Sequence, residues 1–325
     1  MTGLDALTAR LGLGDMIGEP TPLSGGLMHR VCRVRTEAGD CVVKAVNPEV
    51  AARPGALENI ENGERVGAAL ASVVPAVAAL AFDGRHVVEQ GGRWYVVYPY
   101  TDGQSAFPPD ITAAHCAAVG DALGRMHRAN VAVPGIRPEV EPTPAIDWPE
   151  LLALSPAGAT WCDGLEAALP ELVAWTDAAG EADARDMDAP VLTHRDLDPK
   201  NVLWRGPSPF LIDWEAAGYA RPRRELLEVA LYWADDGEGG LDGALCEALL
   251  SAYARHMPLR GDWTPVFAAG RANLMAWLAY SVRRASGQTS RDKDEVRLGA
   301  AEVRKTLGAL HGYEARIETL KRLLR

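Results

Sequence analysis

The sequence is poor in the features that mark secreted, membrane and metal-cluster proteins. Its five cysteines are an odd number without close spacing, so we expect reduced thiols in a cytoplasm rather than a disulfide framework. Cysteine and histidine do not recur at the intervals of a zinc site. The first residues carry an acid at Asp5 and lack the basic and apolar regions of a secretory signal. The most apolar window, 66–82, is broken by Pro75, and we interpret it as a helix end and a buried strand rather than a membrane span.

Basic charge is scarce as well, since 33 Lys and Arg face 44 Asp and Glu and leave a net charge of −11. This balance argues against nucleic acid or an anionic membrane as a partner, and it would attract a cationic small molecule. Segment 139–190 has twelve acids and one base, interleaved with Trp148, Trp161 and Trp175. We interpret it as a solvated acidic face with inward-packed tryptophans. The alternative is a wall that attracts a cation through its charge and ring faces.

The length of 325 residues and the 48% apolar fraction indicate two lobes with a sizeable core. Alternating segments at 30–36 and 40–46 predict a hairpin, and residues 86–100 predict a second one around Gly91 and Gly92. Helical spacing lies between them, and a helix of about five turns should begin at an N-cap, Asp110. We therefore expect an α+β chain with a β-rich lobe at 1–100 and a mainly helical lobe at 101–325.

A dense polar motif, "THRDLDPKNVLW", sits between apolar runs. It places Asn201 five residues after Asp196, and "FLIDWE" then places Asp213 behind an apolar triplet. An amide and a carboxylate on neighbouring segments can hold a hard divalent cation, which leaves Asp196 to meet a substrate hydroxyl. Phosphoryl transfer needs this arrangement, because it depends on positioning and charge neutralisation around the γ-phosphate.

The other parts of a nucleotide site precede this motif in the chain. Lys44 lies in the apolar strand "CVVKAV", where a buried cation could meet phosphates. A turn that could cover the phosphates with backbone comes before it, at Ser24, Gly25 and Gly26. The following helix offers three acids that could hold the lysine: Glu58, Glu61 and Glu64.

Together these stretches resemble the aminoglycoside phosphotransferase and choline kinase-like family of small-molecule kinases, whose fold is similar to that of protein kinases. The resemblance extends over residues 22–233 and implies a bilobal protein kinase-like fold with a small β-rich N-lobe and a larger, mainly helical C-lobe. In this family Asp196 would orient and deprotonate the acceptor hydroxyl, and Asn201 and Asp213 would bind Mg²⁺. Lys44 would hold the α- and β-phosphates of ATP or GTP.

The resemblance also implies roles for residues around the lysine and the hinge. Glu64 would pair with Lys44, and we prefer it to Glu61 because the apolar turn "VGAAL" follows it. The nucleotide base would lie against the hinge between the lobes, at Tyr98 to Thr101, with Tyr98 and Tyr100 as cofactor-binding residues. Ser24, Gly25 and Gly26 would cover the phosphates.

The chain departs from its relatives in ways that bear on the substrate. Trp214 and Glu215 follow Asp213 in place of Phe-Gly and no Ala-Pro-Glu segment follows, so an activation loop is missing and a protein kinase is disfavoured. Arg195 replaces the glycine common in antibiotic kinases, and Arg221 stands where the family often has an acid.

Five further residues carry weaker expectations. His194 and His127 should be structural, Trp204 and Trp214 should lie in the core, and Lys200 could be solvated or touch a phosphate.

We therefore expect an enzyme, an ATP- or GTP-dependent O-phosphotransferase that uses Mg²⁺ and acts on a small molecule. An antibiotic is ranked first as acceptor, in particular an aminoglycoside or another amine-bearing natural product. The alternatives are a metabolic kinase for choline or homoserine, and a catalytically silent nucleotide-binding protein. The intact set of Lys44, Asp196, Asn201 and Asp213 speaks against the silent alternative.

Overall fold

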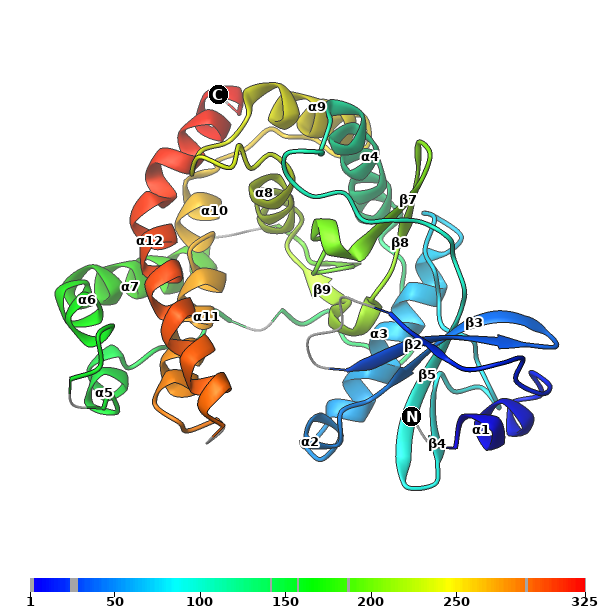
Figure 1. The fold of residues 1–325 in the computed structure, drawn as a ribbon. Coiled ribbons are helices and arrows are strands. Elements are labelled where there is room, and N and C mark those ends of the chain that lie inside the picture. The colour runs from blue at the N-terminus through cyan, green and yellow to red at the C-terminus, as the bar shows by residue number, and fades with distance from the viewer. Residues whose placement is uncertain are drawn as a thin grey trace. The chain divides into compact units, whose positions relative to one another are not determined.

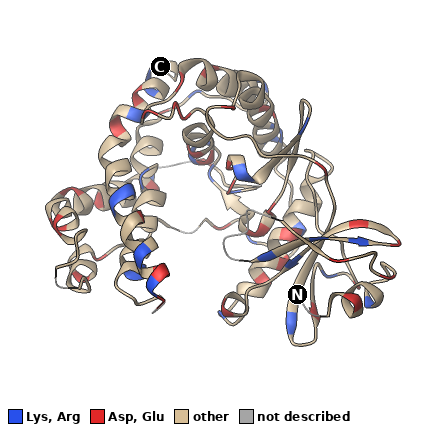
Figure 2. Ribbon diagram, in the orientation of Figure 1, with Lys and Arg blue, Asp and Glu red and all other residues tan. Residues whose placement is uncertain are grey.

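A computed structural model describes the protein at residues 3–23, 29–140, 142–156, 158–185, 188–289 and 292–324. The chain divides into two compact units, each assembled from three segments. The first unit comprises Met1–Pro138, Pro190–Ala220 and Ser251–Met257, and the second comprises Glu139–Ala189, Arg221–Leu250 and Pro258–Arg325. The lobes expected at 1–100 and 101–325 stay a prediction. Figure 1 shows the strands and helices, and Figure 2 shows acidic and basic residues interspersed over both units.

The first unit contains a five-stranded antiparallel sheet with strand order β1-β2-β3-β5-β4. The strands are β1 (Thr21–Pro22), β2 (Arg30–Thr36), β3 (Gly39–Ala45), β4 (Val87–Gln90) and β5 (Arg93–Pro99). Both predicted hairpins are confirmed. Gly91 and Gly92 have φ angles of 59° and 75°, which only glycine adopts freely, so they close the β4–β5 turn.

Two helices cover the opposite faces of this sheet (Figure 1). Helix α1 (Leu4–Arg10), which the sequence reading missed, buries Leu4 and Leu7 against one face. Helix α3 (Ala56–Leu70), which follows the short α2 (Pro48–Ala51), buries Ile60 against the other. Alternate strand residues point to opposite faces, which is why two separate clusters form across one sheet.

Two sequence predictions need correction. Helix α4 (Ala113–Ala129) begins after Thr112 rather than at Asp110, because Thr112 and His115 form a reciprocal capping box. The window 66–82 contains no regular strand. After α3 ends, Ala76 forms only an isolated bridge to Leu211, with the Val77 N–H donating to the Leu211 carbonyl at 2.8 Å.

The polar motif lies on two short two-stranded sheets of the first unit. Strand β6 (Val191–Thr193) pairs with β9 (Gly218–Ala220), and β7 (Val202–Arg205) pairs with β8 (Ser208–Leu211). Two single 3₁₀ turns, η1 (Pro199–Asn201) and η2 (Trp214–Ala216), adjoin the β7–β8 hairpin at its open end. The residues of the motif are therefore held by short, closely spaced elements.

The second unit is helical. The remaining helices of the chain are α5 (Trp148–Ala153), α6 (Cys162–Ala167), α7 (Leu169–Arg185), α8 (Pro222–Trp233), α9 (Gly243–Ala254), α10 (Thr264–Ala269), α11 (Ala272–Ala285) and α12 (Lys293–Leu323). Trp148 and Trp161 are buried with residues of α11 and α12, and Trp175 packs against them, so the inward-packed interpretation is confirmed. All five cysteines are free thiols. Within the described residues, no helix combines the length and the apolarity that crossing a membrane requires.

Candidate active site

The β7–β8 hairpin brings the two predicted metal ligands together. The ladder pairs Val202 with Leu211, and the Ile212 N–H donates to the Asn201 carbonyl at 2.9 Å. Asn201 and Asp213 therefore leave the hairpin at the same end. Asp213 has a φ of 64°, a left-handed conformation that aspartate tolerates better than most residues, and it turns the chain sharply into η2.

Asn201 also fixes the predicted catalytic base. Its buried Nδ2 donates to the backbone carbonyl and to the Oδ2 of Asp196, each at 2.8 Å. Burial raises the pKa of Asp196, and the nearby Lys200 cation opposes the rise. Lys200 Nζ lies 3.3 Å from Asp196 Oδ1 and 3.5 Å from Asp198 Oδ2. Lys200 thus contacts the predicted catalytic carboxylate, which neither reading of it from the sequence foresaw.

Lys44 is buried between two carboxylates. Its Nζ lies 2.6 Å from Asp213 Oδ1 and 2.9 Å from Glu215 Oε2. Burial alone would lower the pKa of Lys44, but the two carboxylates outweigh burial and raise it above its ordinary value. The structure therefore joins strand β3 to the turn after β8 through a charged lysine.

Glu215 and His29 belong to this cluster and were missed as functional residues. His29 Nδ1 accepts a hydrogen bond from the Asn47 N–H at 3.1 Å, so Nε2 carries the proton and donates to Glu215 Oε2 at 3.2 Å. Burial would raise the pKa of Glu215, but His29 and Lys44 lower it to about 2. The only signal in the sequence was the position of Glu215 two residues after Asp213.

Glu64 does not make the ion pair with Lys44 that the sequence predicts. The Tyr98 hydroxyl donates to Glu64 Oε1, while the short contacts of Lys44 go to Asp213 and Glu215. Glu64 is fully buried, and its Oε2 has no hydrogen-bond partner among the described residues. Burial raises the pKa of Glu64 to about 7, although Tyr98 and Lys44 both act to lower it.

Glu61, the alternative partner for Lys44, is engaged elsewhere. Its carboxylate accepts hydrogen bonds from the backbone N–H groups of His86 and Val87, at 3.0 and 2.9 Å, and contacts the His86 ring. Burial would raise the pKa of Glu61, but these bonds lower it. Glu61 therefore ties α3 to β4.

Helix α3 lies directly on the turn that carries Asp213. A Cβ atom at Gly63 would be 2.3 Å from the Trp214 carbonyl oxygen, and one at Gly67 would be 2.6 Å from Trp214 Cγ. Trp214 is fully buried and its ring lies 4.5 Å from that of His194. Both were expected to be structural, and this is confirmed, because His194 accepts from the Asp196 N–H at 3.3 Å and donates to the Ile212 carbonyl at 3.0 Å.

The oxygens available at this site fit Mg²⁺. Nδ2 of Asn201 is used by Asp196, so its Oδ1 remains as a donor to a cation, and Lys44 engages only Oδ1 of Asp213. Amide and carboxylate oxygens are the ligands that Mg²⁺ takes, usually few in number and completed by water and phosphate. In the described part of the chain no group of three or more His, Cys, Asp or Glu could hold a metal by itself.

The remaining predicted nucleotide residues are placed as follows. Ser24, Gly25 and Gly26 lie outside the described residues. The ring of Tyr98 is buried on the sheet face that packs against α3, so only its backbone can meet a nucleotide. The Tyr100 N–H donates to the Asp40 carbonyl at 3.1 Å, and the Arg33 guanidinium lies 3.9 Å from the centroid of its ring.

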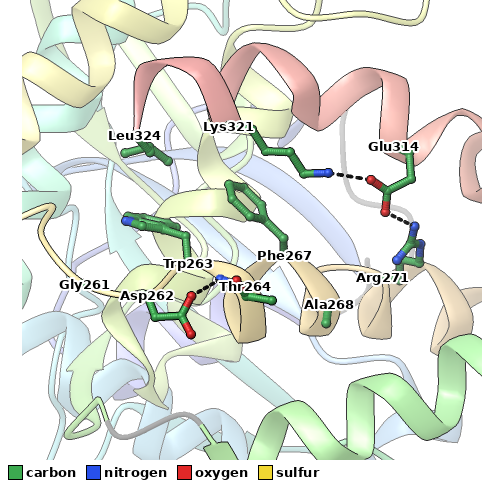
Figure 3. Close-up of a pocket in the computed structure, with 10 residues that line it drawn as sticks. All are labelled: Gly261, Asp262, Trp263, Thr264, Phe267, Ala268, Arg271, Glu314, Lys321 and Leu324. Carbon is green, nitrogen blue, oxygen red and sulfur yellow. Dashed lines mark hydrogen bonds and ion pairs between the residues drawn. The ribbon is translucent and has the colours of Figure 1, made fainter.

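A separate hollow of about 540 Å³ lies in the second unit (Figure 3). Trp263 and Phe267 line it, and Glu314 bridges Arg271 and Lys321 along one wall. None of the predicted site residues belongs to it. Two basic side chains, Arg271 and Lys321, and two acidic ones, Asp262 and Glu314, line it. The lining therefore favours neither a cationic nor an anionic ligand.

Comparisons with known proteins identify the family of the chain. A family model described as "Phosphotransferase enzyme family" matches residues 19–259. Homoserine kinase of Pseudomonas aeruginosa strain UCBPP-PA14 is 31% identical over 181 residues, which are 54% of each chain. Homoserine kinase of Gluconacetobacter diazotrophicus is 30% identical over 203 residues, 59% of this chain and 60% of that one. The chain thus spans little more than half the length of these curated relatives.

Solved structures show the fold. A spectinomycin phosphotransferase in complex with ADP and spectinomycin matches with a TM-score of 0.71 at 14% identity, covering 96% of this chain and 98% of that one. An amicoumacin kinase matches with a TM-score of 0.65 at 15% identity, covering 95% of this chain and 94% of that one. The expected α+β fold of the aminoglycoside kinases, similar to protein kinases, is confirmed.

Proposed function

Because this chain belongs to the phosphotransferase enzyme family, we propose that it transfers the γ-phosphoryl group of ATP or GTP to a hydroxyl of a small molecule in the cytoplasm. One observation carries the proposal. Asn201 donates to Asp196 through its side chain and accepts the Ile212 N–H at its carbonyl, which supports Asp196 as the base and Asn201 and the adjacent Asp213 as metal ligands. A merely structural loop has no need of this combination.

Each residue of the cluster then has a role. Asp196 aligns the acceptor hydroxyl and accepts its proton, and burial makes this carboxylate a better proton acceptor by raising its pKa. Lys44 holds the α- and β-phosphates. Asn201 and Asp213 would hold Mg²⁺, which neutralises phosphate charge when bound. Glu215 keeps Lys44 in place, and His29 in turn holds Glu215, because Glu215 Oε2 contacts both Lys44 Nζ and His29 Nε2.

Two acceptor classes are consistent with the chain. An amine-bearing antibiotic is favoured by the net charge of −11 and by the fold likeness to kinases named for spectinomycin and amicoumacin. A metabolic amino alcohol is favoured by the homoserine kinases among the curated relatives, with choline as a further candidate. Aminoglycosides, homoserine and choline all carry a cationic nitrogen and a hydroxyl.

The test is a panel of aminoglycosides, other antibiotics, homoserine and choline, incubated with the purified protein, Mg²⁺ and either ATP or GTP. A mass gain of one phosphate identifies the acceptor, and the Asp196→Asn variant is the matched control. Transfer by the wild type that the variant lacks supports the proposal. Tight nucleotide binding without transfer or hydrolysis would establish the silent alternative instead.

A further inference from the structure

The buried carboxyl group of Glu64 has one oxygen without a partner. Oε1 accepts a hydrogen bond from the Tyr98 hydroxyl, whereas Oε2 is buried and has no hydrogen-bond donor among the described residues. A buried carboxylate needs donors for both oxygens or a cation in contact with it, and one phenol hydroxyl does not meet this need. Glu64 therefore favours its protonated form, which agrees with the rise of its pKa to about 7 on burial.

Four titratable side chains act on the charge of Glu64 from the elements packed against α3. Tyr98 comes from β5, Lys44 comes from β3, and Asp213 and Glu215 come from the turn after β8. Beside the effect of burial, Tyr98 and Lys44 lower the pKa of Glu64, and the two carboxylates raise it. The protonation of Glu64 thus depends on where the charges of Lys44 and Asp213 are placed.

The ligand roles proposed above compete with the contacts that Lys44 makes in the structure. Lys44 Nζ lies 2.6 Å from Asp213 Oδ1 and 2.9 Å from Glu215 Oε2. A divalent cation on Asp213 would repel this ammonium group, and nucleotide phosphates would attract it away from both carboxylates. The buried Oε2 of Glu64 is an acceptor of the same cluster that still lacks a partner.

We propose that binding of a metal–nucleotide complex releases the proton of Glu64, and that the resulting carboxylate receives Lys44 as the lysine turns away from Asp213. The O–H bond of the carboxylic acid breaks, its electron pair stays on the carboxylate, and the proton passes to the buffer. Tyr98 is a positioning residue in this step, because its hydroxyl occupies Oε1 and leaves Oε2 for Lys44. The inference rests on the proposed function, since it requires phosphates at Lys44 and a metal ion at Asp213.

The proton makes nucleotide binding weaker at low pH. Below pH 7 Glu64 is mostly protonated before binding, so binding must expel the proton, and the nucleotide affinity falls with the pH. With a pKa of about 7 before binding and one near the ordinary 4.5 afterwards, the chain releases about 0.9 protons at pH 6 and about 0.1 at pH 8. The Kd of the nucleotide should accordingly be about 10-fold lower at pH 8 than at pH 6.

Titration calorimetry of the full chain with ADP or GDP and saturating Mg²⁺ counts the released protons. Each titration is repeated in buffers of low and high ionisation enthalpy, and the difference in binding enthalpy gives the number of protons. Neither nucleotide can donate a γ-phosphoryl group, so the result does not depend on phosphoryl transfer. Glu64→Gln should still bind the nucleotide, release about 0.9 protons fewer at pH 6, and lose the pH dependence of Kd.

Glu61→Gln is the matched control. Glu61 lies on the same helix, but the backbone N–H groups of His86 and Val87 hold its carboxylate, so its replacement should leave proton release unchanged. Tyr98→Phe should move the curve of proton release to higher pH, because the Tyr98 hydroxyl opposes the rise that burial causes in the pKa of Glu64. A purely structural role of Tyr98 would leave this curve in place. Circular dichroism checks that each variant is folded.

Equal proton release by wild type and Glu64→Gln would overturn the inference, as would a wild-type Kd that is the same at pH 6 and pH 8. If Glu64→Gln does not fold, infrared difference spectra of the wild type decide the question. The carbonyl stretch of a protonated carboxyl group should disappear on nucleotide binding, and its persistence would contradict proton release. A failure of phosphoryl transfer in the acceptor panel leaves these measurements unaffected, whereas a chain that binds neither nucleotide would overturn both proposals.

Discussion

Replacing Glu64 with glutamine should remove a pH dependence from the stability of the protein. Glu64 is fully buried, and burial raises its pKa from an ordinary value of 4.5 to about 7. Between these two pH values the folded chain holds a proton that the unfolded chain has released. The favourable contribution of protonated Glu64 is therefore fully present below about pH 4.5 and is lost as the pH rises through about 7.

The size of the effect follows from the two pKa values. A shift from 4.5 to about 7 corresponds to about 3 kcal/mol of differential stability. Glutamine is uncharged at every pH and can still accept the hydrogen bond from the Tyr98 hydroxyl. Relative to the wild type, Glu64→Gln should thus be of similar stability at pH 4.5 and more stable by about 3 kcal/mol at pH 8.

Urea unfolding at several pH values measures this difference, with Glu61→Gln as the control. Glu61 lies on the same helix, but its pKa is lowered by the His86 and Val87 N–H groups, so its stabilisation is present at neutral pH and lost on acidification. The two variants should therefore change the pH profile in opposite directions. If the free-energy difference between wild type and Glu64→Gln is the same at pH 4.5 and pH 8, then Glu64 is not the buried, protonated group described above.

Three further predictions concern Asp196 and Lys200 in the predicted catalytic loop and the packing of α3 on Trp214. Asp196→Asn should lower kcat by roughly 10² to 10⁴-fold with circular dichroism unchanged, since general bases contribute that much; full activity would remove Asp196 from the mechanism. Lys200→Met should move the acidic limb of the rate profile to higher pH, because the Lys200 cation lowers the pKa of Asp196, and an unmoved limb would mean that Lys200 swings away during turnover. Gly67→Ala should destabilise the protein by about 1–3 kcal/mol in thermal unfolding, because its methyl group would overlap Trp214. Gly180→Ala on α7 is the control, because an added Cβ there would have no atom within 4 Å, and it should stabilise the protein by about 0.5–1 kcal/mol. Equal effects of the two substitutions would contradict the close packing of Gly67 against Trp214.

The sequence predicts those features that depend on local pattern. Strands β2 and β3 alternate buried and exposed residues and meet at a glycine, so their pairing can be foreseen. The spacing of Asp196, Asn201 and Asp213 was enough to predict their convergence, because a short hairpin joins the last two. The start of α4 was ambiguous, since Asp110 and Thr112 are both good N-caps and only the bond from His115 decides between them.

The side-chain partners of Lys44 and Glu64 could not be predicted from local sequence patterns. Strand β5 reads "RWYVVYP" and is apolar on both faces, so its sequence does not say which side Tyr98 occupies. The structure puts Tyr98 on the α3 side, where its hydroxyl donates a hydrogen bond to Glu64 Oε1. The exposure of Trp277 and Tyr280 on α11 could not be foreseen for a related reason, because the surrounding sequence "LMAWLAY" is apolar throughout and predicts a buried helix.

Three consecutive residues of one turn hold the elements of the site together. Asp213 turns toward β3 and contacts Lys44, Trp214 packs on α3 and beside the His194 ring, and Glu215 turns back to Lys44 and His29. Successive side chains of a regular strand could not reach these places together. The left-handed φ of 64° at Asp213 makes it possible, because it breaks the alternation immediately after β8. The same backbone conformation that orients the carboxylate of Asp213, the proposed metal ligand, therefore also lets Trp214 pack on α3 and places Asp213 and Glu215 around Lys44, the proposed phosphate-binding lysine.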